Sequence, residues 1–201
     1  MSHKIKKISK QMTIVFLSLL IVGIIFITGY AQGSEKTLDS TEIDAMTEAF
    51  ERGELTAREA YRLAQTEAVD WAADAVLVDI SNFRGTSLTN GRSARWKLEF
   101  NSNSMNKELE VHISRGKILQ IMEEKFKKRE AITGTWIDTP KALDISFEYF
   151  TNKPVDNYWF GLSSKEGIAT WYVKCDYDDG VPTWVHINVL TGEVIKTREG
   201  Y

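Results

Sequence analysis

The chain has 201 residues and a formal net charge of −3, with 25 Lys and Arg residues against 28 Asp and Glu residues. Four of the lysines and none of the acids lie in residues 1–31, so residues 32–201 hold 21 basic and 28 acidic residues, a net charge of −7. This acidic part argues against nucleic acid as a partner and against adhesion to an anionic membrane surface. The single cysteine, Cys175, excludes an intramolecular disulfide.

Residues 1–31 are predicted to target the chain to a membrane. Four lysines precede an uncharged, mostly apolar run from Met12 to Tyr30. As a helix this run would be about 28 Å long, close to the roughly 30 Å of a bilayer core. The basic flank keeps the N-terminus cytoplasmic, which favours a single retained span in the cell membrane with an extracytoplasmic C-terminal domain. Small residues at Gly29 and Ala31 leave the alternative open of a protein secreted after cleavage near Ala31.

Residues 32–53 are interpreted as a polar tether followed by a short helix at Thr41–Arg52, which Gly53 ends. The sequence from Thr56 to Glu59 has the pattern of a capping box, in which the Thr hydroxyl and the Glu carboxylate satisfy backbone N–H groups reciprocally. A second helix is predicted after it, with an apolar face suited to a flat surface. That face carries Ala60, Leu63, Ala64, Ala68 and Trp71.

Strict apolar–polar alternation predicts antiparallel strands with one buried face. In the first half these strands are expected at Val76–Ile80, Ala94–Phe100, Leu109–Ile113 and Ile118–Met122. The second half repeats the plan. It is expected to have a helix capped by Thr139 with Pro140 at its first position, and then strands at Tyr158–Leu162, Ala169–Cys175, Thr183–Val189 and Val194–Ile195.

The strongest feature of the sequence is that the two halves match. Trp96 and Trp171 are 75 residues apart, and His112 and His186 are 74 apart. A duplicated unit therefore organises the chain. We expect a first domain at 54–124, a charged linker at 125–134 and a second domain at 135–201. The charged run Glu123–Glu130 is predicted to be a solvated linker or a frayed helix, and the two tryptophans are predicted to be core anchors.

No catalytic, cofactor-binding or metal-binding residues are predicted, and no cofactor is expected. His112 and His186 alternate with apolar neighbours, which places them on the exposed face, and no metal-ligand spacing accompanies them. Cys175 shares the inward parity of Trp171, so its thiol should be buried with a raised pKa. The acids from Asp176 to Asp179 precede Gly180 and favour a hairpin turn over a calcium loop.

The outward face of the second sheet is the one candidate interaction surface. It carries Tyr172, Lys174, Trp184 and His186, whereas the matching face of the first sheet is entirely polar. Exposed aromatic residues of this kind are enriched at recognition sites. Two interpretations stay open: a partner-binding face, or a face covered by the first domain or by the Thr41–Arg52 helix.

The closing motif of the second half, Trp184–Asn188 followed by Thr191–Ile195, resembles that of the PepSY domain family, as does the capped helix of the first half. The first half departs from the closing motif at Ser114–Ile118. The resemblance implies an α+β fold of two tandem cystatin-like units behind an N-terminal transmembrane helix. Each unit would pack one helix on an antiparallel sheet of about four strands.

The resemblance also implies a regulatory or peptidase-inhibiting role and brings no catalytic residues. We therefore expect a non-enzymatic, extracytoplasmic protein-binding module. Its most specific candidate partner is a peptidase that acts in trans. The alternative is an extracytoplasmic ligand sensor, or an envelope-assembly component, with no protease partner.

Overall fold

The structure is a computed structural model, and it describes residues 52–83, 90–150 and 154–200. The expected membrane-targeting segment, the tether and the Thr41–Arg52 helix up to residue 51 lie outside these residues. None of the helices in the described ranges is both long enough and apolar enough to span a bilayer.

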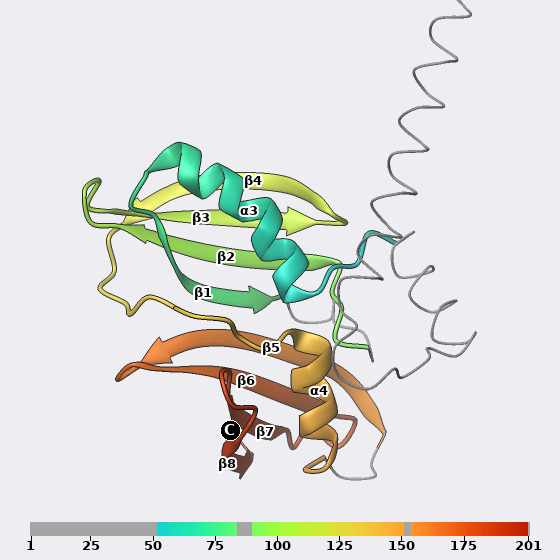
Figure 1. The fold of residues 1–201 in the computed structure, drawn as a ribbon. Coiled ribbons are helices and arrows are strands. Elements are labelled where there is room, and N and C mark those ends of the chain that lie inside the picture. The colour runs from blue at the N-terminus through green and yellow to red at the C-terminus, as the bar shows by residue number, and fades with distance from the viewer. Residues whose placement is uncertain (1–51, 84–89, 151–153, 201) are drawn as a thin grey trace, which may run out of the picture. The chain divides into compact units, whose positions relative to one another are not determined.

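The described chain has an α+β fold with two helices and one eight-stranded antiparallel sheet (Figure 1). The strand order is β4-β3-β2-β1-β5-β6-β7-β8, so each half contributes one helix and four sequential strands. Both helices lie on the same face of the sheet (Figure 1). The first half contains α3 (Ala57–Trp71), β1 (Val76–Asn82), β2 (Arg95–Ser102), β3 (Lys107–Ser114) and β4 (Lys117–Lys125). The second half contains α4 (Thr139–Phe147), β5 (Val155–Lys165), β6 (Ile168–Tyr177), β7 (Thr183–Asn188) and β8 (Val194–Glu199).

The α+β class is confirmed, but the expectation of a separate sheet in each half is wrong. Strands β1 and β5 pair antiparallel, with Ile80 opposite Leu162 and Ser81 opposite Gly161. Without this pairing each of the two strands would present an unpaired backbone edge. Pairing them satisfies both edges and joins the halves at a central seam.

Helix α3 begins where the capping box predicts. The Thr56 hydroxyl accepts from the Glu59 N–H, and the Glu59 carboxylate accepts from the Thr56 N–H at 2.8 Å. The buried residues of α3 are all alanines, which lets the helix lie close against the sheet. Leu63, expected on the buried stripe, is instead 39% exposed.

Helix α4 is capped by Asp138 rather than by the expected Thr139. The Asp138 carboxylate accepts from the Thr139 N–H at 2.8 Å and from the Arg58 N–H of α3 at 3.0 Å. Thr139 is the first helical residue, and its hydroxyl accepts from the Ala57 N–H at 3.2 Å. The carboxylate is the better cap here because it serves the N-terminal turns of both helices at once.

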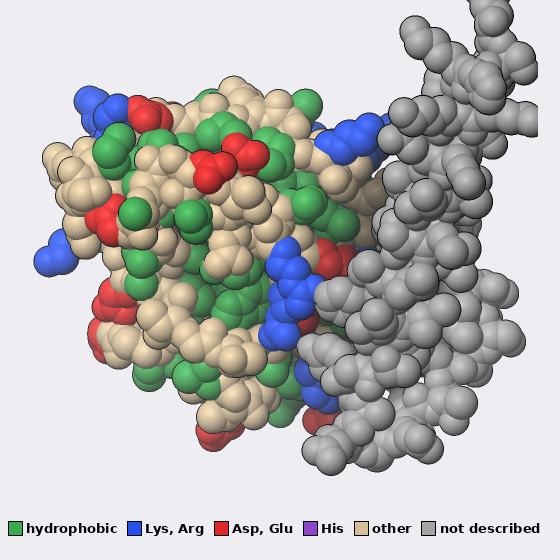
Figure 2. All heavy atoms as spheres, turned by 45° about the horizontal axis from the view of Figure 1, so that its top comes forward, with side chains coloured by type: hydrophobic (Ala, Val, Ile, Leu, Met, Phe, Trp, Pro, Cys, Tyr) green, Lys and Arg blue, Asp and Glu red, His purple; other side chains and the backbone are tan. Residues whose placement is uncertain are grey.

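One hydrophobic core lies between the helices and the sheet. Trp96 and Trp171 are fully buried in it, which confirms both as core anchors. Ile80 and Leu162, the register partners at the seam, belong to the same core. On the side of the molecule shown in Figure 2, hydrophobic side chains appear in several separate areas between polar and charged ones.

Candidate functional site

The outer face of the sheet, opposite the helices, carries the residues singled out from the sequence. One row of register partners crosses six strands and holds His112, Lys97, Ser81, Gly161, Tyr172 and His186. Strand spacing of about 4.8 Å puts the two histidines about 24 Å apart, too far to share a metal ion. In residues 52–83, 90–150 and 154–200, no group of three or more His, Cys, Asp or Glu side chains is placed to hold a metal.

The predicted face of the second half is present, with one change. Tyr172 and His186 are register partners whose rings meet edge to face, with centroids 4.8 Å apart. Trp184 is partly exposed beside them. Lys174, in contrast, is only 2% exposed, so it is not available for contact with a partner.

Lys174 is buried because two tryptophans flank it. Its register partners are Trp159 on β5 and Trp184 on β7, and its ammonium lies 5.5 Å from the centre of the Trp184 ring. The ammonium also pairs with Asp176. Alternation along β6 predicts that Lys174 faces outward, but it gives no sign that side chains of the neighbouring strands cover it.

Trp159 is the residue of this face that the sequence analysis missed. Its indole packs edge to face on Trp184, with centroids 5.7 Å apart, and lies over Gly161 two residues along the strand. A Cβ atom at position 161 would come within 2.4 Å of the ring, so only glycine leaves room for it. The Trp159-x-Gly161 spacing, with apolar Tyr158 and Phe160 facing inward, was the signal available in the sequence.

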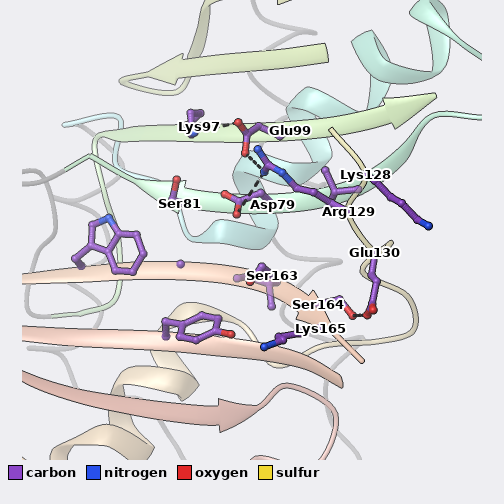
Figure 3. Close-up of a pocket in the computed structure, with 15 residues that line it drawn as sticks. Asp79, Ser81, Lys97, Glu99, Lys128, Arg129, Glu130, Ser163, Ser164 and Lys165 are labelled. Carbon is purple, nitrogen blue, oxygen red and sulfur yellow. Dashed lines mark hydrogen bonds and ion pairs between the residues drawn. The ribbon is translucent and has the colours of Figure 1, made fainter. Parts of the chain in front are cut away.

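An open groove of about 690 Å³ runs along the outer face at the β1–β5 seam (Figure 3). Ser81, Gly161 and Ser163 keep its floor low. One wall combines Lys97 and Glu99 of β2 with residues 128–130 of the linker, and the other holds Trp159, Tyr172 and Lys165. We call this the seam groove.

The linker that forms one wall is mostly exposed but is held in place by ion pairs, and the alternative of a frayed helix is wrong. The run begins inside β4, which extends to Lys125. Arg129 then hydrogen-bonds Glu99 of β2 and lies 3.8 Å from Asp79 (Figure 3). It also lies 3.6 Å from Glu108. Lys127 pairs with Glu108 at 2.8 Å.

The next linker residue contacts the other half. The Glu130 carboxylate accepts hydrogen bonds from the backbone N–H groups of Glu166 and Gly167 at 2.9 and 2.8 Å, in the turn between β5 and β6. It also accepts from the Ser164 hydroxyl. Arg129 contacts the first half of the sheet and Glu130 contacts the second half, so together the two residues hold the linker across the seam.

Two carboxyl groups of the groove titrate in different pH ranges because of these contacts. Burial, reinforced by the nearby Glu99 carboxylate, raises the pKa of Asp79 to about 6. Burial also opposes the charged form of Glu99, but the Arg129 hydrogen bond and Lys97 outweigh it and lower the Glu99 pKa. Glu99 therefore carries the stable negative charge, and Asp79 titrates just below neutral pH.

The remaining candidates fit structural roles. Cys175 is fully buried, as predicted, and burial raises its pKa to about 11. Asp178 to Gly180 form the predicted turn between β6 and β7, closed by a 2.9 Å hydrogen bond from the Gly180 N–H to the Tyr177 oxygen. Burial, with Lys196 and Arg198 nearby, lowers the pKa of His186.

Comparison of the chain with protein-family models, with curated proteins and with solved structures found no match.

Proposed function

We propose that the chain is a non-enzymatic binding module that engages another protein through the outer face of its sheet. The observation that carries the proposal is the seam groove, which presents the rings of Trp159 and Tyr172 beside charged side chains. Aromatic residues and arginine are the types enriched in protein interfaces. Both helices of the described residues lie on the opposite face, so neither of them covers this one (Figure 1).

We also propose that the two halves are PepSY-like units of cystatin-like layout, joined edge to edge. Matching contacts in the two cores support this interpretation. The Trp96 indole donates to the Leu55 oxygen at 2.9 Å, and the Trp171 indole donates to the Ile137 oxygen at 2.8 Å. Leu55 and Ile137 each precede the N-cap of their half's helix. The domain boundaries 54–124 and 135–201 remain predictions.

The location and the target complete the proposal. Residues 1–31 would hold the module on the outer side of the cell membrane, or release it after cleavage near Ala31. A peptidase acting in trans is the most specific partner, because the PepSY resemblance implies a regulatory or inhibitory role toward such enzymes.

A second candidate function is an extracytoplasmic ligand sensor. The volume of the seam groove, about 690 Å³, lies within the roughly 300–1,000 Å³ typical of small-molecule sites. Because linker residues 128–130 line the seam groove, a ligand bound in the groove would affect the contacts of the linker with both halves. A low-mass compound that raises the unfolding midpoint of the wild type, but not of a Trp159→Ala variant, would favour this function.

Affinity capture with the full chain tests the leading proposal. The chain, held in a mild nonionic detergent, is used as bait for native membrane and secreted fractions. The test variant carries Tyr172→Ser and Trp184→Ser, and the matched control carries Val69→Ser and Tyr149→Ser, at exposed positions on or next to the helices.

We expect a peptidase to be retained by the wild type and the control but not by the test variant, whose circular dichroism should be unchanged. Equal retention by all three would contradict the proposal. Loss of folding in the test variant would show that the two aromatic residues serve stability instead.

A further inference from the structure

We infer that the seam groove binds an extended acidic peptide segment of a protein partner, with Lys165 and Lys128 facing its carboxylates and Trp159 its apolar side chains. The inference rests on the proposed function and names the chemistry of the partner. It follows from three properties of the groove: its unpaired charge, its low floor and the strands that form it.

The unpaired charge of the groove is positive. Glu99 is engaged by Lys97 and Arg129, and Glu130 by backbone N–H groups of the β5–β6 turn. Lys128 and Lys165 are exposed and make no hydrogen bond or ion pair with the residues that the structure describes. They lie on the two sides of the groove (Figure 3).

The remaining carboxyl group weakens this positive charge only in part. Asp79 lies 3.8 Å from the Arg129 guanidinium, which offsets its negative charge. Because residues 32–201 carry a net charge of −7, an acidic ligand is repelled by most of the chain's surface and attracted here. Charge complementarity therefore selects an acidic ligand for this groove.

The floor of the groove favours an elongated ligand. Ser81 and Ser163 have short side chains, and Gly161 has none, so the Trp159 ring can lie close over the strand there. An extended peptide directs successive side chains to opposite sides. Alternate residues would thus meet the aromatic wall and the lysines.

The strands that form the groove determine how a peptide is held. Strands β1 and β5 are central and pair at residues 79–81 and 161–163, so the backbone groups at this part of the groove are engaged by neighbouring strands. A peptide in the seam groove is therefore held by side chains, in contrast to one added to the sheet edges at β4 or β8. Binding should then depend on Trp159 and the lysines rather than on strand edges.

Fluorescence anisotropy of labelled peptides tests the inference on the full chain in nonionic detergent. The probes are three peptides of about ten residues in which Phe alternates with Glu, Gln or Lys. The groove variant carries Lys128→Glu and Lys165→Glu. The control carries Lys117→Glu and Lys141→Glu, the same charge change at exposed positions outside the groove.

We expect the Glu–Phe peptide to bind the wild type and the control with similar dissociation constants, and the groove variant about tenfold more weakly. Binding should weaken as salt is raised, because exposed charges are screened. Trp159→Ala should weaken binding of the same peptide, and the Lys–Phe peptide should bind least.

Different failures separate this inference from the proposed function. Equal affinity for the Glu–Phe and Gln–Phe peptides, lost in Trp159→Ala, would overturn the acidic assignment while leaving a peptide-binding groove. An acidic polysaccharide such as alginate that displaces the Glu–Phe peptide and binds more tightly would overturn the peptide assignment. Absence of binding by every peptide would overturn both the acidic and the peptide assignment of the groove. The proposed function is contradicted separately, by equal retention in the affinity capture.

Discussion

The indole N–H of Trp96 donates a 2.9 Å hydrogen bond to the backbone oxygen of Leu55, the residue just before the N-cap of α3. Trp171 repeats this contact on Ile137 before α4, at 2.8 Å. Each tryptophan thus ties the second strand of its half to the start of its helix. The two contacts differ in one respect. The Leu55 oxygen also accepts a hydrogen bond from the Ser93 N–H at 2.9 Å, whereas the Ile137 oxygen has Trp171 as its one donor among the described residues.

This difference predicts unequal costs for the same substitution. Trp96→Phe removes one hydrogen bond and leaves a small cavity but keeps the Leu55 oxygen paired, so we expect a loss of about 1–2 kcal/mol in the free energy of unfolding. Trp171→Phe leaves the Ile137 oxygen without its donor, and we expect about 2–4 kcal/mol. Urea unfolding of both variants measures the difference. Equal losses would show that the second acceptor contact is irrelevant.

The linker contacts predict that Arg129 stabilises the fold. Arg129→Ala leaves Glu99, whose side chain is 3% exposed, and the buried Glu108 with fewer partners, and we expect a loss of about 3 kcal/mol. Adding Glu99→Gln should recover part of it, because the uncompensated charge is removed. Lys128→Ala is the control: Lys128 is adjacent in the chain and has no ion-pair partner among the residues that the structure describes, so the change should alter stability by less than about 0.5 kcal/mol. Urea unfolding measures both variants. If Arg129→Ala loses no more free energy of unfolding than Lys128→Ala, the structural role of the linker is contradicted.

Asp79 predicts a dependence of stability on pH. Its pKa rises from the ordinary value of 3.8 to about 6 on folding, so the folded state holds a proton that the unfolded state has released. Stability therefore falls as pH rises from about 4 to about 6 and is constant on either side as far as this group is concerned. The size of the effect is about 3 kcal/mol, because a change of one in pKa corresponds to about 1.4 kcal/mol.

Asp79→Asn should abolish this part of the pH dependence and make the chain more stable than the wild type at pH 7. Urea unfolding at several pH values between 3 and 8 checks it. A wild type that gains stability between pH 4 and 6 relative to the variant would reverse the assigned direction of the shift.

Cys175 predicts a protected thiol. It is fully buried and its pKa is raised to about 11, so little thiolate exists at pH 8 and reagent has no access. Ellman's reagent should label the folded chain at a rate set by unfolding and label it at once in denaturant. Rapid labelling of the folded chain would show that the inward side of β6 opens readily.

The sequence predicted local structure well because local structure depends on neighbours along the chain. Alternation located the strands, and the capping box located the start of α3. Alternation does not specify which strands pair, so the β1–β5 seam, which depends on contacts such as Ile80 with Leu162, was not predicted. The cap of α4 was displaced to Asp138 because that carboxylate also serves α3.

The candidate face was predicted only in part, because alternation within a strand shows which side chains face outward but not how side chains pack between strands. Tyr172, Trp184 and His186 lie together because they occupy facing positions on neighbouring strands. Lys174 is buried and Trp159 joins the face through packing across β5, which a pattern within one strand does not report. The linker wall was missed because a polar strand face gives no sign that a charged segment will pair with it.

Site-specific photo-cross-linking in cells tests the central claim, that the outer face binds a partner. A benzoylphenylalanine residue replaces Tyr172 in the full chain, and in a control it replaces Tyr149, which is 42% exposed next to α4. The account predicts a protein adduct of defined mass from position 172 and none from position 149. An adduct from position 149 alone, or equal adducts from both, would contradict it.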